Sequence, residues 1–376
     1  MTSNSLAKAR TSLVSHFDAF RKKAANDRVQ AGLAVAEERL ARRLMTLPEP
    51  VLRRLAGRPF INGEGAVLDL HTQLVVRLSR LRKTAMSAEE LGAARRRFDH
   101  LAGVLALGPA AGITIRDTTL GDRPARVYTP SGAHREGLPG LLYMHGGGFV
   151  FGNLDTHDSI CQALAARAQV VVVSLDYRLA PEHPLPAGLD DVIRALDELL
   201  LDRARFGIGA RARVAIGGDS AGANLATGAC LARRGHARSA DFQLLVYPSA
   251  DATRAAASHA ELGQGFVLTT DAMSECLRHY LAGDLRHERL VDPRLSPLHA
   301  PDHRDLPPAH VLTAGFDPLR DEGRSYVQKL AAAGVPTTHV EASSLVHGFL
   351  NIAGAVPAAR RALDELGSAL GRALRD

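Results

Sequence analysis

The chain has 376 residues, which is long for one hydrophobic core and short for two full domains, so a single large domain with an appendage fits best. Hydrophobic residues make up 46% and charged residues 23%, the balance of a soluble globular protein. The net charge is +6, and the basic excess lies in the first hundred residues, which hold 19 Lys and Arg against 10 Asp and Glu. Because these charges are dispersed, we expect solvated helical faces and no binding to nucleic acid or to an anionic membrane.

The N-terminal residues lack the uninterrupted apolar stretch of a signal peptide, and no segment approaches the roughly 18 apolar residues of a membrane span. Cys161, Cys230 and Cys276 are widely spaced, with no metal-binding spacing. They are interpreted as buried, reduced thiols. We therefore expect a cytoplasmic protein that holds no metal and no organic cofactor and has no membrane span.

The first hundred residues predict helices. Apolar residues recur near a 3.6 period over 33–44 and again over 68–81, and Pro48 and Pro50 interrupt the first run. Ser87 followed by Glu90 has the spacing of a capping box that opens a further helix. We expect residues 1–105 to form a helical region that contributes to a cap.

From Ile113 onward, short β-rich runs alternate with helical runs, and several of the β runs are almost wholly apolar. This alternation predicts a mostly parallel eight-stranded sheet with helices on both faces, over residues 106–376. The predicted strands are Ile113–Thr118, Ala125–Tyr128, Leu141–His145, Val170–Leu175, Val214–Gly217, Phe242–Tyr247, His310–Ala314 and Thr337–Glu341. The predicted helices between them are Asp158–Arg167, Leu189–Arg205, Ala221–Arg234, Glu322–Ala333 and Ala358–Leu374.

One long connection breaks this rhythm, between Tyr247 and His310. It is rich in Gly and Pro and contains one helical pattern, Asp271–Leu281. So long a connection within a compact domain is usually functional, and we expect residues 251–300 to form a cap insertion over the active site.

Gly218-Asp219-Ser220-Ala221-Gly222 matches G-x-S-x-G between a predicted strand and a predicted helix. In this context the pattern indicates a nucleophile elbow, in which Ser220 occupies a strained turn that leaves its neighbours no room for a Cβ. The helix start directs free N–H groups toward incoming negative charge. A plain glycine-rich turn is the alternative, and the strand–turn–helix context argues against it.

A second glycine-rich segment, His145-Gly146-Gly147-Gly148-Phe149, directly follows the predicted strand Leu141–His145. Bare backbone N–H groups are needed where a tetrahedral oxyanion forms, so we predict an oxyanion hole from the N–H groups of Gly147, Gly148 and Ala221. His145 itself is expected to hold the loop by hydrogen bonds.

A nucleophilic serine needs a base and an acid, which follow it along the chain in the order Ser, acid, His. His347 lies in a loop after the last predicted strand, where such sheets build their sites, whereas His310 and His339 lie inside strands. His347 is therefore the predicted base. Asp317 stands after the penultimate strand and is the predicted acid. Asp321 is its rival, although Asp321 is expected to begin a helix as a cap.

At these residues a family resemblance is plain. The motifs HGGGF (145–149), LDYRLAPEHPLPAGLDD (175–191), GDSAGANL (218–225), GFDPLRDEG (315–323) and HGF (347–349), in this order, resemble the hormone-sensitive-lipase-like esterases, which are relatives of arylacetamide deacetylases. The likeness covers roughly residues 110 to 374. It implies an α/β-hydrolase fold with a helical cap, a triad of Ser220, Asp317 and His347, and oxyanion glycines Gly147 and Gly148. Ala223 departs from the family, which more often has Gly there.

The predicted function is that of a serine carboxylesterase that cleaves short- to medium-chain esters. Two alternatives stay open: an amidase or deacetylase with the same triad, and a small-molecule receptor that has lost catalysis. Retention of His347 argues against the receptor. The expected partner is a small ester substrate, and a homodimer is compatible with the last strand and the leucine stripe of the last helix. Asp176 is interpreted as a polar brace, with a role in propping the oxyanion loop as the second hypothesis.

Overall fold

The computed structural model describes residues 39–80, 91–132 and 137–375. The chain forms two compact units, Met1–Leu47 and Pro48–Asp376. In the first unit, residues 39–45 are helical, and the helix ends before Pro48, as the sequence predicts. The earlier part of that helical run, and the capping box at Ser87 and Glu90, lie outside the described residues.

The second unit contains the predicted eight-stranded sheet, in the order β1-β2-β4-β3-β5-β6-β7-β8. Strand β2 pairs antiparallel with β1 and with β4, and all the other neighbours run parallel. The sheet is therefore mostly parallel, as predicted. The strands are β1 (Ile113–Leu120), β2 (Arg123–Pro130), β3 (Gly140–Met144), β4 (Val171–Leu175), β5 (Val214–Asp219), β6 (Phe242–Val246), β7 (Ala309–Phe316) and β8 (Thr337–Val346).

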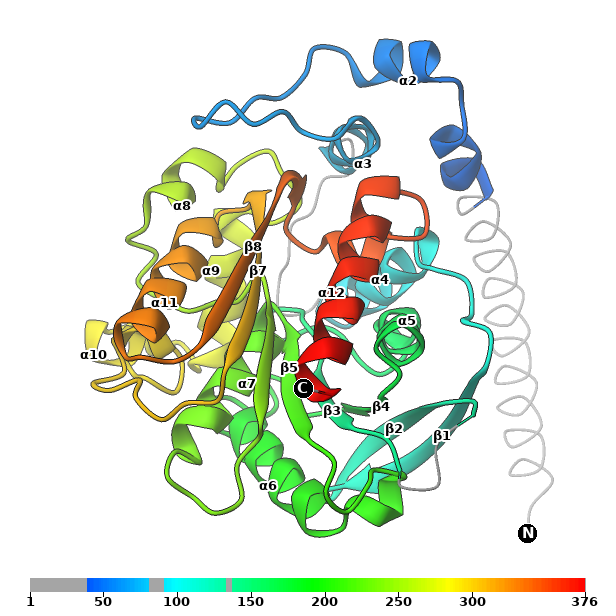
Figure 1. The fold of residues 1–376 in the computed structure, drawn as a ribbon. Coiled ribbons are helices and arrows are strands. Elements are labelled where there is room, and N and C mark those ends of the chain that lie inside the picture. Colours follow the sequence, from blue (N-terminus) through cyan, green and yellow to red (C-terminus); the bar gives the residue numbers. More distant parts are fainter. Residues whose placement is uncertain (1–38, 81–90, 133–136, 376) are drawn as a thin grey trace, which may run out of the picture. The chain divides into compact units, whose positions relative to one another are not determined.

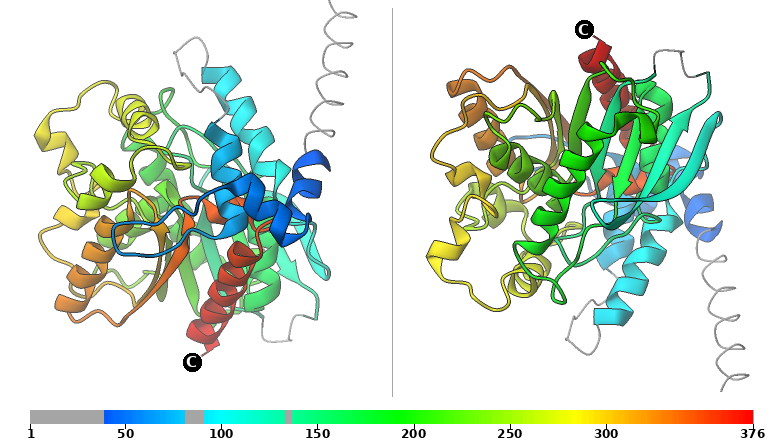
Figure 2. Two further views of the ribbon diagram at one scale, coloured as in Figure 1. Left: turned by 90° about the horizontal axis from the view of Figure 1, so that it is seen from above. Right: turned by 90° about the horizontal axis from the view of Figure 1, so that it is seen from below.

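Helices cover both faces of this sheet because the central strands are apolar on both sides. In β3, Leu142 and Met144 pack into the core on one face, and Leu141 and Tyr143 pack into the core on the other. The first face carries α6 (Ala187–Leu201), α7 (Ala221–Ala232) and α11 (Arg320–Ala332), and the second carries α5 (Asp158–Ala168) and α12 (Pro357–Arg375). Helices α5 and α12 lie side by side (Figures 1 and 2).

The remaining helices lie before the sheet and in the long connection after β6. The first group is α2 (Glu49–Ala56), α3 (Leu70–Arg80) and α4 (Leu91–Val104). The second group is α8 (Ala257–Leu262), α9 (Thr270–Tyr280), α10 (His287–Leu290) and the 3-10 turn η3 (Pro297–His299). Helix α9 matches the predicted helix Asp271–Leu281 to within one residue. The assignment of residues 1–105 and 251–300 to a cap stays a prediction.

Some details differ from those predicted. Helix α6 ends at Leu201 instead of Arg205, because the Asp202 side chain accepts a hydrogen bond from Arg205 N and caps a separate 3-10 turn, η2 (Arg203–Phe206). His145 lies just outside β3.

Cys276 is half-buried, whereas Cys161 and Cys230 are buried, and all three are free thiols.

None of the helices in the described ranges combines the length and the apolarity that a membrane crossing requires. Within the same ranges, no group of three or more His, Cys, Asp or Glu side chains is placed to hold a metal ion.

Candidate functional site

Ser220 stands at the sharp turn between β5 and α7, with φ 55° and ψ −119°. This backbone conformation is strained for a residue with a side chain. The glycines two residues away on each side are required by crowding: a Cβ on Gly218 would lie 2.2 Å from the Met144 carbonyl oxygen, and a Cβ on Gly222 would lie 2.0 Å from it. Ser220 N donates to the Val246 carbonyl on the next strand at 2.9 Å. The turn therefore projects the hydroxyl beyond the carboxyl ends of the parallel strands.

His347 and Asp317 meet Ser220 from the far end of the sheet. The ring nitrogen Nε2 of His347 lies 2.9 Å from Ser220 Oγ, and its Nδ1 lies 2.7 Å from Asp317 Oδ2. The other carboxylate oxygen of Asp317 accepts a hydrogen bond from Leu319 N at 2.8 Å, and the residue is fully buried. The structure thus brings together the three side chains that the sequence predicts as nucleophile, base and acid.

Asp321, the rival acid, makes different contacts. Its carboxylate accepts hydrogen bonds from Ser258 N at the start of α8 and from Arg320. The sequence predicts a cap at the start of its own helix, α11. Asp321 does lie in the first turn of α11, but its side chain binds the N-terminal turn of α8 instead.

The glycine-rich loop after β3 lies beside the nucleophile. Gly147 and Gly148 have φ values of 121° and 62°, and a Cβ on Gly147 would lie 2.2 Å from the Phe151 carbonyl oxygen. Only glycine accommodates this backbone path. Among the hydrogen bonds of the described residues, none uses the N–H groups of Gly147, Gly148 or Ala221 as donors. These three backbone N–H groups therefore donate no hydrogen bond within the described residues, and their role as an oxyanion hole stays a prediction.

Asp219 joins the glycine-rich loop to the nucleophile turn, a role that the sequence analysis missed. Its Oδ1 accepts hydrogen bonds from Gly146 N at 2.9 Å and from the Tyr143 hydroxyl at 2.8 Å, and it lies 3.2 Å from His157 Nε2. Burial alone would raise the pKa of this carboxyl group, but the charge and hydrogen bonds of His157 and Tyr143 outweigh burial and leave the pKa lowered. Asp219 is therefore a buried carboxylate immediately before the nucleophile.

The loop is supported from beneath by aromatic rings. The Tyr177 hydroxyl donates to the His145 carbonyl at 2.8 Å, and the two rings stack at 4.4 Å. Burial lowers the pKa of His145 to about 3, so its ring is neutral, and Nδ1 donates to the Gly146 carbonyl at 2.9 Å. His145 therefore holds the loop by hydrogen bonding, as the sequence analysis expects. The hypothesis that Asp176 props the loop has no side-chain contact behind it in the described residues, and Tyr177 and Asp219 supply that support.

Replacing Asp219 by asparagine is expected to lower the free energy of unfolding at pH 7 by about 2 kcal/mol, because a neutral amide replaces a buried carboxylate that accepts hydrogen bonds from Gly146 N and the Tyr143 hydroxyl. The wild-type carboxylate has a pKa below its usual value of 3.8, so its stabilising contribution is present above that value and is lost as the pH falls through the folded-state pKa. In urea unfolding measured between pH 7 and pH 2, the free energy of unfolding should therefore decrease less with falling pH in Asp219→Asn than in the wild type. Parallel curves for the two proteins would contradict the assignment of a buried carboxylate.

The chain is similar to known proteins over most of its length. Residues 141–351 match the family described as having the alpha/beta hydrolase fold. Carboxylesterase NlhH of Mycobacterium tuberculosis is 40% identical over 313 residues, which cover 81% of this chain and 97% of that protein. Ethyl acetate hydrolase of Pseudomonas putida is 34% identical over 287 residues, which cover 74% of this chain and 89% of that protein.

A solved structure extends the likeness to three dimensions. An alpha/beta hydrolase enzyme from the metagenome of Lake Arreo, Spain, superposes with a TM-score of 0.75 at 37% identity, covering 81% of this chain and 98% of that one. The sheet order, the strained serine turn and these relatives lead to one conclusion. The chain belongs to the hormone-sensitive-lipase-like family of α/β-hydrolase esterases and is a carboxylic ester hydrolase.

Proposed function

We propose that the enzyme hydrolyses short- to medium-chain carboxylic esters through an acyl-enzyme on Ser220, with His347 as the base and Asp317 as the acid that orients it. The observation that carries this proposal is the unbroken series of contacts from Ser220 Oγ to His347 Nε2, at 2.9 Å, and from His347 Nδ1 to Asp317 Oδ2, at 2.7 Å. Both distances are within hydrogen-bonding range, so a proton can pass from the hydroxyl to the ring.

In the first half of the reaction, His347 removes the proton of Ser220 as Oγ bonds to the ester carbonyl carbon. The negative charge that develops on the carbonyl oxygen is stabilised by the N–H groups of Gly147, Gly148 and Ala221. His347 then gives its proton to the departing alcohol, and the carbon–oxygen bond to that alcohol breaks. Ser220 is left as an ester of the acyl group.

In the second half, His347 removes a proton from water as the water oxygen attacks the acyl carbon. The same three N–H groups stabilise the second oxyanion, and the proton returns from His347 to Ser220 Oγ as the acid leaves. Asp317 stays ionised throughout and stabilises the imidazolium that forms in each half.

The preference for short to medium acyl chains is supported by how closely α9 packs against the glycine-rich loop. The rings of Tyr280 and Phe149 stack at 3.9 Å with an interplanar angle of 4°. A Cβ on Gly148 would lie 2.7 Å from the Cys276 sulfur, so this side of the loop is already filled. The relative named for ethyl acetate hydrolysis also favours a small acyl group.

The same triad would also serve an amidase or deacetylase, which needs stronger protonation of its leaving group. Within the part of the chain that the structure describes, His347 has no further hydrogen-bond partner that would strengthen protonation of a leaving amine, so we favour the ester. The receptor alternative is disfavoured because the serine, the base and the acid are all in contact. The homodimer, the cytoplasmic location and the absence of nucleic-acid binding stay predictions from the sequence.

A p-nitrophenyl alkylphosphonate tests the proposed nucleophile. We expect it to modify Ser220 with a stoichiometry of one phosphonyl group per chain, detected by peptide mass spectrometry, with loss of all esterase activity. On unmodified enzyme, kcat/KM should be high for p-nitrophenyl acetate and butyrate and lower for the palmitate, and p-nitroacetanilide should be cleaved far more slowly. Modification of another residue, or hydrolysis that survives complete labelling of Ser220, would exclude the proposal.

A further inference from the structure

The hydrogen-bonded pairing between β7 and β8 is interrupted immediately before the acid and the base. Pairing is regular from Ala309 to Ala314 and resumes at Phe316, which pairs with Val346. Between the two regular stretches, one residue of β7 faces three residues of β8. Asp317 and His347 directly follow the ends of β7 and β8. The register of the pair Phe316–Val346 therefore sets the position of the Asp317 carboxylate relative to the His347 ring.

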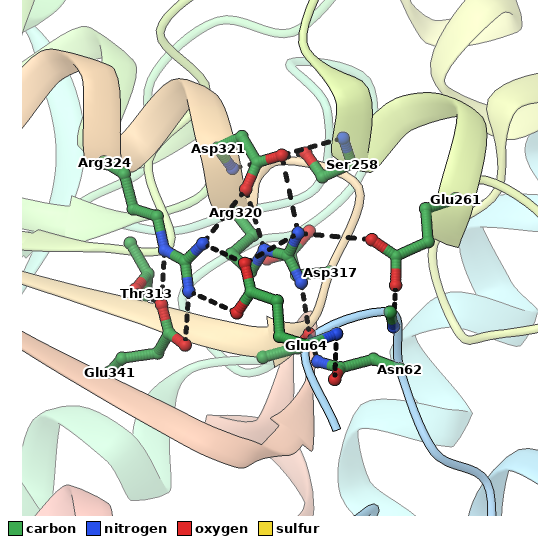
Figure 3. Close-up of polar contacts among 12 residues, drawn as sticks. Asn62, Glu64, Ser258, Glu261, Thr313, Asp317, Arg320, Asp321, Arg324 and Glu341 are labelled. Carbon is green, nitrogen blue, oxygen red and sulfur yellow. Dashed lines mark hydrogen bonds and ion pairs between the residues drawn. The ribbon is translucent and has the colours of Figure 1, made fainter. Parts of the chain in front are cut away.

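Two backbone carbonyls at this interruption are bound by a segment from the other end of the chain. The side-chain amide of Asn62 donates from Nδ2 to the Gly315 carbonyl at 3.0 Å, and Asp69 N donates to the Ser344 carbonyl at 2.9 Å. The strands approach closely here, since a Cβ on Gly315 would lie 2.0 Å from the Ser343 carbonyl oxygen. Residues 62–69 thus supply hydrogen bonds to two carbonyls where the pairing of β7 and β8 is irregular, and Figure 3 shows Asn62 among its polar neighbours.

Asn62 is held in one orientation by its own turn. Its Oδ1 accepts hydrogen bonds from Glu64 N at 3.1 Å and from Ala66 N at 2.9 Å. Two N–H donors approach this atom, so it must be the oxygen, and the NH₂ group must face Gly315. Asn62 is only 8% exposed, and the loss of its donor would leave the hydrogen bond to a buried carbonyl unmade. The same carbonyl receives a second, longer contact of 3.4 Å from Arg320.

Ion pairs fasten this turn to the helix that follows the acid. Arg324 donates to Glu64 at 2.8 Å and to Glu341 of β8 at 2.8 Å, and Arg320 contacts both Glu64 and Glu261 (Figure 3). The hydrogen bond from Arg324 lowers the pKa of Glu64, which keeps it charged at neutral pH. These pairs are partly exposed, and such pairs contribute little individually. We therefore infer that these ion pairs hold the turn against α11 and that they do not align Asp317.

An apolar cluster beneath the turn joins it to the residues that precede the acid and the base. It combines side chains of the N-terminal segment, of the connection after β6, and of the last two strands. Its buried members are Leu68, Val76, Leu262, Phe316 and Val346. Phe316 and Val346 form the resumed pair, so the packing and the hydrogen bonds of residues 62–69 converge on the point from which both side chains project.

We propose that Asn62 is a positioning residue for the acid–base pair, acting through the Gly315 carbonyl, and that residues 62–69 fix the register in which β7 and β8 resume pairing. This inference rests on the proposed roles of Asp317 and His347. Asn62 touches no reacting atom. Its effect on catalysis passes entirely through the alignment of Asp317 with His347.

Asn62→Asp provides the sharpest test, because it keeps Oδ1 and replaces only the donor. We expect kcat for p-nitrophenyl butyrate, per active site titrated with phosphonate, to fall roughly 10- to 100-fold, with KM changed by less than about twofold. Asn62→Ala, which deletes the amide without adding charge, should show the same loss and is the variant to measure if Asn62→Asp fails to fold. Gln243→Glu is the matched control, because Gln243 Nε2 donates to the Pro307 carbonyl at the opposite end of the sheet. It should lower Tm and leave kcat per titrated site unchanged.

A double-mutant cycle separates alignment from general stability. The rate at which the phosphonate modifies Ser220 can be followed over days, so it remains measurable in Asp317→Asn. The Asn62 substitution should slow this rate in the wild-type background and change it by less than about twofold in the Asp317→Asn background. An equal loss in both backgrounds, or a lowered Tm with unchanged kcat, would overturn the positioning role. An Asp317→Asn enzyme that reacts at the wild-type rate would instead refute the proposed function.

Discussion

Ser220→Ala is expected to lower kcat for p-nitrophenyl acetate by a factor of about 10⁶, because it removes the hydroxyl that forms the acyl intermediate in the proposed mechanism. The fold should survive, since alanine keeps the backbone path between β5 and α7 and removes only Oγ. We expect Tm to stay within about 2 °C of the wild type. Initial rates with purified protein and a thermal unfolding curve provide the two measurements.

Ser174→Ala is the matched control for this substitution. Ser174 is a fully buried serine on β4, which β3 separates from β5, and it takes no part in the described contacts of Ser220 and His347. Its replacement should leave kcat unchanged. Turnover by Ser220→Ala within tenfold of the wild type would mean that hydrolysis proceeds by direct attack of water or at another residue, and the acyl-enzyme mechanism would have to be abandoned.

Asp317→Asn is expected to reduce kcat by a factor of about 10⁴ while changing KM little. A neutral amide that presents its NH₂ group to His347 Nδ1 forces the ring proton onto Nε2, and a protonated Nε2 cannot accept the proton of Ser220. An amide in either orientation also fails to stabilise the imidazolium. Steady-state rates of p-nitrophenyl butyrate hydrolysis, normalised to titrated sites, measure the loss.

Asp321→Asn distinguishes the two candidate acids, which lie four residues apart in the same motif. Asp321 binds Ser258 N and two arginines and makes none of the described contacts with His347, so its replacement should lower kcat by less than about tenfold. If Asp321→Asn were the more damaging substitution, the assignment of Asp317 as the acid would be wrong.

Much of the fold follows from the sequence because the relevant signals are local. Strands such as β3 and β4 are continuous apolar runs, which can be recognised without knowing which strands lie beside them. All eight strands lie close to where the sequence predicts them. The turn at Ser220 was predictable for the same reason, since its glycines, its strand and its helix are contiguous. His347 and Asp317 followed from their order along the chain and their place after the last two strands.

The parts that the sequence analysis missed depend on contacts between distant residues. Asp219 lies inside the recognised motif, but its hydrogen bond to Gly146 N becomes apparent only when β3 and β5 are known to be adjacent. Asn62 is separated from Gly315 by 253 residues and lies in a turn with no periodicity. The interruption between β7 and β8 likewise leaves no pattern in the sequence of either strand alone.

The sheet order divides the catalytic machinery between its middle and its margin. The nucleophile and the glycine-rich loop arise from β5 and β3, which have partners on both sides, whereas the base follows β8, which has only one neighbour. A terminal strand opens more readily than a central one. We therefore expect local unfolding of β8 to disable the enzyme while the central strands stay folded, which would make the contacts that hold β8 in place the main determinant of its working lifetime.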